Sequence, residues 1–337
     1  MSSNNKHILV LGAGSVGKRH LSNLANMNCK LSALDPNIDR LSDISKEVPL
    51  VFQFTNLEQI DQYWHKFSGV IVCSPPKFHK EQCIIVAQKD IPILLEKPLT
   101  RDLKEAIELY NSLNKLNGSL LLGYTYRWWQ PLIEFRRKLK NGKVGKPLHA
   151  KFFMSAHLAD WHPWERYQDF FMASKELGGG ALLDESHFID LMIWMFGLPE
   201  SVYASVEKIS NLDIETDDNV DMVIKYENGL RVIIHLDLYG RPHEKYISVT
   251  GDNGTLKWSF DPNQIQYSKS MEHNWEEQNF NLERNDMFID VAREFISLID
   301  GHTVSKCTID EGVDVMRIIE ACRISSNEKK VVVLNEI

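Results

Sequence analysis

The stretch that decides the fold is residues 6–35, KHILVLGAGSVGKRHLSNLANMNCKLSALD. Its apolar run at residues 8–11 leads into a glycine-rich turn, Gly12 to Gly17, and helix-forming residues follow that turn. A second strand-like run at residues 29–34 ends at Asp35. This order of strand, glycine turn, helix, strand and acid predicts a βαβ unit that binds a dinucleotide.

The three glycines of the turn have the spacing Gly-x-Gly-x-x-Gly, and each is expected to serve one purpose. Gly12 permits the tight turn, Gly14 lets the backbone approach a pyrophosphate, and Gly17 lets the helix pack closely on the strand. The N–H groups and the dipole of the helix that starts near Ser15 attract the phosphates. The predicted cofactor contacts in this turn are Gly12, Ala13, Gly14, Ser15, Val16 and Gly17.

Asp35 lies 18 residues after Gly17, where its carboxylate can accept hydrogen bonds from the ribose hydroxyls of a dinucleotide. Arg40 follows closely and offers a cation that would suit the 2′-phosphate of NADP. Repulsion between the Asp35 carboxylate and that phosphate decides between the two, so the sequence favours NAD over NADP.

The composition predicts a two-domain soluble protein. A chain of 337 residues is too long for one ordinary hydrophobic core. Its 43% hydrophobic and 25% charged residues are typical of globular proteins, and a net charge of −8 argues against nucleic acid as a partner. No apolar run is long enough to span a membrane. Five scattered cysteines without Cys-x-x-Cys spacing indicate reduced thiols, so we expect a cytoplasmic protein.

Strand-like and helix-like segments alternate up to residue 123. The expected strands after Asp35 are residues 51–54, 69–73, 91–95 and 119–123. The expected helices are residues 39–47, 57–67, 78–89 and 102–116, the last with Thr100 as its N-cap. This alternation predicts an α/β fold, with a doubly wound parallel (Rossmann) sheet over residues 1–123.

Ligands of such sheets bind outside the carboxyl ends of the strands. Two further strand ends carry informative residues, Ser74-Pro75-Pro76 with His79, and Glu96-Lys97-Pro98. We expect both to surround the same crevice as the glycine turn. The predicted cofactor contacts there are Ser74, Pro75, His79, Glu96 and Lys97.

Residues 124–337 no longer alternate between strand-like and helix-like segments, and they are predicted to form a second, α+β domain. Strand-like runs occur at residues 202–207, 219–226, 230–238, 245–250 and 255–260. Hairpin-type turns at residues 227–229 and 252–254 predict a mostly antiparallel sheet. We expect helices over residues 286–298 and 309–325 to pack beside it. A sheet face left uncovered by the domain's own helices would favour a homodimer or homotetramer.

In combination, these motifs resemble the glucose–fructose oxidoreductase and myo-inositol dehydrogenase family of NAD(P)-dependent oxidoreductases, over nearly the whole chain. Residues 178–184, GGGALLD, with His187 and Asp190, add to the resemblance. It implies that Lys97 is catalytic, that its bond to Pro98 is cis, and that Asp184 and His187 belong to the site. Here the pair is spaced Asp-x-x-His, whereas many members have Asp-x-x-x-His. Either spacing keeps both side chains on one helix face.

Alcohol oxidation requires a group that accepts the hydroxyl proton while the nicotinamide takes the hydride. A histidine suits this role near neutral pH. Our hypothesis gives His187 the role of general base and lets Lys97 hold and polarise the substrate oxygen. Asp184 orients or contacts the same hydroxyl system.

Residues 157–167 mix aromatic and hydrogen-bonding side chains, as a sugar-binding surface would. Trp161, Trp164 and Tyr167 are therefore candidate substrate contacts, with packing at a subunit contact as the alternative. The histidines of this segment lack regular ligand spacing, so no metal site is predicted. Arg127 could reach a substrate phosphate or carboxylate, or form a structural salt bridge, and the sequence leaves both open.

The leading interpretation is an NAD-dependent dehydrogenase of a sugar, cyclitol or nucleotide-sugar. One alternative keeps the site but uses transient sugar oxidation for glycoside cleavage, with no net NADH. Another is a non-catalytic, dinucleotide-binding regulatory protein. The sequence alone names neither the sugar nor the direction of the reaction.

Overall fold

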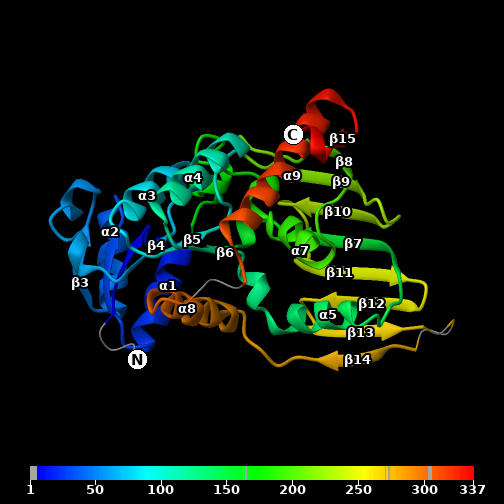
Figure 1. The fold of residues 1–337 in the computed structure, drawn as a ribbon, viewed down its shortest axis with the longest axis horizontal. Helices are drawn as coiled ribbons and strands as arrows, with labels where there is room; N and C mark the ends of the chain where they lie inside the picture. Colours follow the sequence, from blue (N-terminus) through cyan, green and yellow to red (C-terminus); the bar gives the residue numbers. More distant parts are fainter. Residues whose placement is uncertain (1–5, 162, 164, 270, 272–273, 303–305) are drawn as a thin grey trace. The chain divides into compact units, whose positions relative to one another are not determined.

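The computed structural model describes every residue except 1–5, 162, 164, 270, 272–273 and 303–305 (Figure 1). The chain forms two compact units, residues 1–125 with 284–313 and residues 126–283 with 314–337. A single boundary after residue 123 was expected. Instead, the chain leaves the first unit after Thr125 and returns to it at Arg284.

The first unit contains a six-stranded sheet with the order β3-β2-β1-β4-β5-β6, and every neighbouring pair is parallel. The strands are β1 (His7–Leu11), β2 (Lys30–Leu34), β3 (Leu50–Phe54), β4 (Gly69–Val72), β5 (Ile93–Glu96) and β6 (Leu120–Gly123). The predicted doubly wound sheet is therefore confirmed. The strand order reverses between β1 and β4, which is where ligands bind in such sheets.

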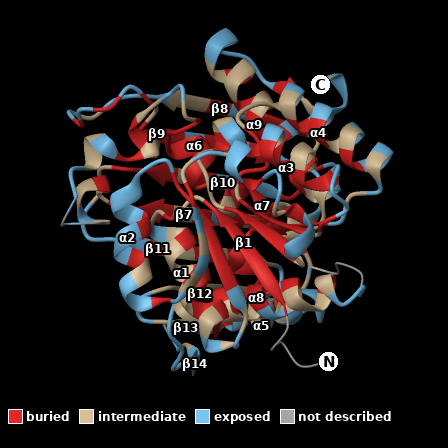
Figure 2. Ribbon diagram, turned by 90° about the vertical axis from the view of Figure 1, so that its left-hand side faces the viewer, coloured by how far each residue is buried: buried red, intermediate tan, exposed pale blue. Residues whose placement is uncertain are grey.

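Four strands of this sheet are buried along their whole length, in agreement with their mainly apolar sequences. Every residue of β1, β4, β5 and β6 is buried, and Figure 2 shows β1 in red throughout. Helices cover such strands on both faces. The helices of this unit are α1 (Ser15–Asn26), α2 (Ile38–Glu47), α3 (His79–Ala87), α4 (Leu103–Leu116) and α8 (Asn285–Ile299).

Three sequence predictions for this unit were wrong. Residues 57–67 form two short 3₁₀ helices, Glu58–Ile60 and Trp64–Lys66, in place of one α-helix. The N-cap of α4 is Asp102, whose carboxylate accepts the Glu105 N–H at 2.9 Å. Thr100 donates its hydroxyl to the Asp102 carbonyl instead.

The third error concerns α8, which was expected beside the antiparallel sheet but packs on α1 in the first unit. The Asn23 and Asn285 amides exchange two hydrogen bonds of 3.2 and 2.8 Å between these helices. The apolar face of α8, with Val291 and Phe295, is buried. Amphipathicity predicts that a helix has an inward face, but it does not identify the partner of that face.

The second unit is built on a nine-stranded, mostly antiparallel sheet, as predicted, with the order β14-β13-β12-β11-β7-β10-β9-β8-β15. The strands are β7 (Pro147–Ser155), β8 (Ser201–Glu207), β9 (Asn219–Lys225), β10 (Arg231–Asp237), β11 (Glu244–Gly251), β12 (Gly254–Ser259), β13 (Gln264–Ser268), β14 (Glu276–Asn279) and β15 (Val332–Val333). Only β7 and β10 pair in parallel in this sheet, among the residues described. The helices are α5 (Gln130–Lys140), α6 (Ala181–Asp184), α7 (His187–Phe196) and most of α9 (Ile309–Glu328).

Side chains of this sheet alternate between a buried and an exposed face. In β9, Val220, Met222 and Ile224 are buried, whereas Asp221 and Val223 are exposed. The exposed face also carries apolar side chains of neighbouring strands, since Tyr203 and Ile233 are 45% and 40% exposed. Within the described part of the chain, no helix is both long enough and apolar enough to cross a membrane.

A buried ion pair joins α7 to the short 3₁₀ helix Thr125–Trp128. The Arg127 guanidinium donates to the Asp190 carboxylate through Nε at 3.0 and 3.1 Å and through Nη2 at 2.7 Å. Both side chains are only 1% exposed. Such a pair costs much desolvation to form, but losing one partner leaves the other charge buried and uncompensated.

We therefore expect Asp190→Asn to lower the free energy of unfolding by about 3–5 kcal/mol, because Arg127 stays buried without a carboxylate. Urea unfolding measures this change. Asp160→Asn is the control, since Asp160 and its ion-pair partner Arg241 are both more than half exposed. An equal effect of the two substitutions would show that the buried pair has no special importance.

Candidate functional site

The glycines of the turn in the first unit differ in whether a side chain would fit at their positions. Gly12 has φ +96°, and a Cβ there would lie 2.8 Å from the Cys73 carbonyl carbon. A Cβ at Gly17 would lie 1.8 Å from the Gly12 carbonyl oxygen. Around Gly14, in contrast, a Cβ would meet nothing within 4 Å. The fold itself requires Gly12 and Gly17, whereas the open space at Gly14 fits a ligand that approaches the backbone.

The first turn of α1 is suited to an anion. Gly14 precedes the helix, provides no side-chain cap, and no acidic residue lies in the first turn. The N–H groups at the start of a helix lack partners within the helix and form its positive end. A pyrophosphate would supply the missing acceptors, so this helix start fits the predicted dinucleotide.

Asp35 is held at the end of β2 by two backbone N–H groups. Its carboxylate is 2% exposed and accepts from Ala13 and Asn37, each at 2.8 Å. The Arg40 guanidinium lies 3.8 Å away and is half exposed. A carboxylate oxygen can accept more than one hydrogen bond, so each oxygen retains capacity for a ribose hydroxyl.

His79 joins the two other strand ends that the sequence singled out. It is buried at the start of α3, with Nδ1 2.9 Å from the Pro98 carbonyl and Nε2 2.8 Å from the Ser74 carbonyl. Burial lowers the pKa of His79, and the carbonyl acceptors oppose that shift. The Ser74 hydroxyl donates to Gln82 at 2.6 Å. Both ring nitrogens therefore contact backbone carbonyls, so His79 links the loop at Ser74 to the loop at Pro98.

Glu96 is the last residue of β5, at the carboxyl edge of the sheet, and Lys97 follows it. The Glu96 carboxylate is buried and lies 2.7 Å from Nε2 of His20, a residue of α1. Lys97 is partly exposed, and its bond to Pro98 is cis, as the family resemblance implied. His20 was not among the predicted site residues. Its position on the helix that follows the glycine turn was the only available signal.

In the second unit, Asp184 and His187 lie on two helices, although one continuous helix was expected. Asp184 is the last residue of α6 and His187 the first of α7, with a turn between them. Asp184 is buried and His187 is partly exposed. The short α6 is held by Asp217, which accepts the Leu182 N–H at 2.8 Å and whose pKa is raised by burial. A shared face of one regular helix therefore does not describe this pair.

The structure adds Tyr126 beside His187, and Lys245 beside Tyr126. The Tyr126 ring contacts the His187 ring edge to face, with centroids 4.9 Å apart. The Tyr126 hydroxyl accepts from the Lys245 ammonium at 3.2 Å, and Lys245 is 9% exposed. Sequence reasoning missed both. A usable signal was the alternation of β11, which places Lys245 on the same inward face as Ile247 and Val249.

The predicted substrate contacts differ in their environment. Arg127 occupies the buried ion pair with Asp190, which is the structural alternative left open above. Trp161 is partly exposed, and the Tyr167 hydroxyl accepts the Asp213 N–H at 3.2 Å. Trp164 lies outside the described residues. Among the described side chains, no group of three or more His, Cys, Asp or Glu residues is arranged to hold a metal ion.

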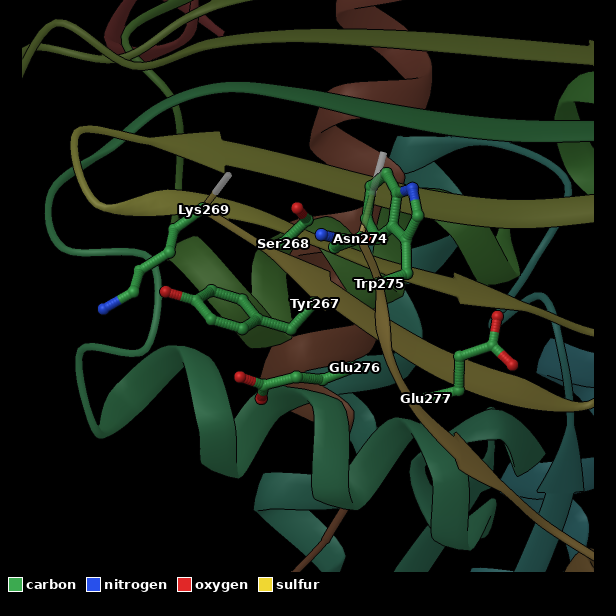
Figure 3. A pocket seen from close by; sticks show the side chains of 7 residues that line it. All are labelled: Tyr267, Ser268, Lys269, Asn274, Trp275, Glu276 and Glu277. Atoms are coloured by element: carbon green, nitrogen blue, oxygen red, sulfur yellow. The ribbon is translucent and has the colours of Figure 1, made fainter. Parts of the chain in front are cut away.

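A surface cavity of about 600 Å³ lies at β13 and β14 of the second unit (Figure 3). It is lined by Tyr267, Ser268, Lys269, Asn274, Trp275, Glu276 and Glu277. The Lys143 ammonium covers the Tyr267 ring at 3.9 Å and pairs with Glu276 at 3.0 Å. None of the predicted cofactor, catalytic or substrate residues lines this cavity, so we do not assign the reaction to it.

The chain is similar to several known dehydrogenases. It is 24% identical over 222 residues to glucose-6-phosphate 3-dehydrogenase of Bacillus subtilis, covering 65% of this chain and 61% of that protein. It is 23% identical over 257 residues to myo-inositol 2-dehydrogenase of Thermotoga maritima, covering 73% of each. The solved structure of levoglucosan dehydrogenase with NADH and levoglucosan has a TM-score of 0.85 at 17% identity, covering 98% of this chain and 99% of that one.

Sequence models of one family match both halves of the chain. Residues 6–124 match the oxidoreductase family domain described as an NAD-binding Rossmann fold. Residues 136–334 match the C-terminal alpha/beta domain of the same oxidoreductase family. The chain therefore belongs to the NAD-binding oxidoreductase family that includes glucose–fructose oxidoreductase and myo-inositol dehydrogenase.

Proposed function

We propose that the protein is an NAD-dependent dehydrogenase that transfers hydride between a carbohydrate carbon and nicotinamide. The carbohydrate is a sugar, a cyclitol or a nucleotide-sugar. One observation carries this proposal. The unhindered Gly14, the anchored Asp35 carboxylate and Lys97 all lie at the carboxyl edge of one parallel sheet. That edge is where such sheets bind dinucleotides, and a lysine there can reach a reacting group.

The first unit is proposed to bind the cofactor, and bound NAD supplies the hydride acceptor. The N–H groups at the start of α1 hold the pyrophosphate, and Gly14 leaves room for it. Asp35 accepts hydrogen bonds from the ribose hydroxyls while Ala13 and Asn37 keep its carboxylate in place. His79 acts indirectly, by holding together the loops at Ser74 and Pro98.

The reacting hydroxyl is proposed to be handled by three side chains. Lys97 holds and polarises the substrate oxygen, His187 accepts the hydroxyl proton, and Asp184 orients the hydroxyl. Tyr126 supports this assignment because its ring fixes one edge of His187. The Lys245 ammonium donates to the Tyr126 hydroxyl and so places a cation beside that tyrosine.

The second unit is proposed to bind the carbohydrate and to form the oligomer. Trp161 and Tyr167 offer aromatic surface for the C–H faces of a sugar ring. Arg127 is no longer a candidate substrate contact, because its guanidinium is committed to Asp190. The exposed sheet face that carries Tyr203, Val223 and Ile233 supports association as a homodimer or homotetramer. We propose a cytoplasmic location.

The decisive experiment is incubation with NAD and a carbohydrate panel, with NADH absorbance and products followed together. The panel contains glucose 6-phosphate, myo-inositol, levoglucosan and a nucleotide-sugar, with NADP in parallel for each. We expect NADH to accumulate from NAD with at least one carbohydrate, and NADPH to accumulate more slowly from NADP. Glycoside cleavage without NADH would instead indicate transient oxidation, and NAD binding without any product would indicate a regulatory protein.

Lys97→Ala should lower kcat by at least about 100-fold, because no ammonium then polarises the substrate oxygen. NADH affinity, measured by fluorescence titration, should change by less than about threefold, since the phosphates and ribose are held elsewhere. Lys89→Ala is the matched control, because Lys89 is an exposed lysine of the same unit. Turnover by Lys97→Ala equal to that of the control would refute the assignment.

Gly14→Ala should weaken NADH binding by about tenfold, or about 1.4 kcal/mol, because the added methyl occupies the space proposed for the pyrophosphate. Thermal unfolding should be almost unchanged, since that methyl meets nothing within 4 Å. Gly17→Ala provides the contrast, because its methyl would collide with the Gly12 carbonyl and destabilise the fold. Full NADH affinity in a folded Gly14→Ala protein would contradict the proposed site.

A further inference from the structure

The residues on either side of Lys97 are each held by a buried histidine from a different helix. On one side, the Glu96 carboxylate meets His20 of α1 at 2.7 Å. On the other side, the Pro98 carbonyl meets His79 of α3 at 2.9 Å. The proposed chemistry uses neither imidazole, yet both contacts end within one residue of the lysine.

The environment of His20 determines which ring nitrogen carries the proton. Its side chain is fully buried, and Nδ1 has no hydrogen-bond partner in the described structure. A proton on Nδ1 would therefore be buried without an acceptor, at an appreciable free-energy cost. The proton lies on Nε2 instead, so His20 donates to Glu96. The Phe288 ring contacts the imidazole edge to face at 5.9 Å and restricts its rotation.

The helix that carries His20 is firmly attached to α8. The Arg19 guanidinium covers the Phe288 ring at 4.8 Å. One turn further along, Asn23 and Asn285 exchange their two amide hydrogen bonds. The imidazole is therefore a donor in a fixed position, on a helix that is held by α8. The first turn of the same helix is the proposed pyrophosphate site.

We propose that His20 is a positioning residue for Lys97. By donating to Glu96, it fixes the end of β5, and so the start of the lysine side chain, relative to the helix that holds the dinucleotide. His79 fixes the following residue through its backbone carbonyl. This inference rests on the proposed function, because it takes Lys97 as the group that holds the substrate oxygen.

Loss of the donor has a defined physical consequence. A leucine at position 20 leaves the Glu96 carboxylate buried without the imidazole, and a buried carboxylate that loses a donor moves toward water or toward another donor. Glu96 and Lys97 are adjacent, so the movement displaces the ammonium. A displacement of about 1 Å in a reacting group can cost about 100-fold in rate.

The test compares His20→Leu with His20→Gln and with a matched control, His7→Leu. The side-chain nitrogen of glutamine reaches about as far as Nε2 and can still donate to Glu96. His7 is also a buried histidine of this sheet, bonded to the Ser32 hydroxyl at 2.9 Å, but it lies at the amino end of β1. The control therefore reproduces the loss of a buried imidazole at the opposite edge of the sheet.

The first readout is steady-state kinetics with NAD and the carbohydrate of the panel that gives NADH. We expect His20→Leu to lower kcat by about 30- to 100-fold, with KM and NADH affinity within about threefold. His20→Gln should recover at least about tenfold of that loss, whereas His7→Leu should keep kcat within about twofold. Wild-type kcat in His20→Leu, with Lys97→Ala inactive, would overturn this inference and leave the proposed function standing.

The second readout needs no carbohydrate. Lysine amines of the NADH-bound protein are labelled with trinitrobenzenesulfonate, and the Lys97 peptide is quantified by mass spectrometry against Lys89. We expect the labelling rate of Lys97 to change at least about threefold in His20→Leu and to stay unchanged in His7→Leu. An unchanged rate in both would overturn the inference even if the wild-type enzyme oxidises a sugar. If His20→Leu does not fold, His20→Asn replaces it, because its amide is too short to reach Glu96.

Discussion

The close contact between α1 and the turn that precedes it is the constraint on which the rest of the first unit depends. There is no room for even one methyl group between Gly17 and the Gly12 carbonyl. This proximity sets the helix start directly behind the turn and brings Ala13 to the Asp35 carboxylate. It also places the second turn of α1 where His20 reaches Glu96. A wider separation would break the contact of Ala13 with Asp35 and the contact of His20 with Glu96 together.

Both units contain buried polar pairs, and such pairs fix the geometry of the groups they join more than they add stability. A buried ion pair such as Arg127 with Asp190 gains little over well-packed apolar residues, because desolvation offsets the attraction. The geometry of the pair is nevertheless specific, because the guanidinium donates to the carboxylate through both Nε and Nη2. His20 and His79 likewise each contact one specific oxygen, that of the Glu96 carboxylate and that of the Ser74 carbonyl. In an oxidoreductase, where cofactor chemistry is intrinsic, such orientation is the main contribution of the protein.

The sequence predicted the parallel sheet well because four of its strands, β1, β4, β5 and β6, are short and mainly apolar, as burial on both faces requires. It predicted the antiparallel sheet less completely. The edge strand β14 is Glu-Glu-Gln-Asn and entirely exposed, so no hydrophobic pattern marks it. The helix expected at residues 57–67 and the cap assigned to Thr100 failed for a related reason. Local propensity is weak where a segment is short and several polar residues compete for one role.

By itself, the sequence determined the elements whose information is local. The glycine spacing, the acid at the end of β2 and the lysine at the end of β5 could be placed on one edge, because parallel strands end on the same side of a sheet. Only the tertiary structure decided the partners. It paired Arg127 with Asp190 across 63 positions, His20 with Glu96 across 76, and α1 with α8 through residues 262 positions apart. A local sequence pattern does not specify the distant partner of a buried charged group. The partner is determined only when the chain packs and water is excluded from both groups.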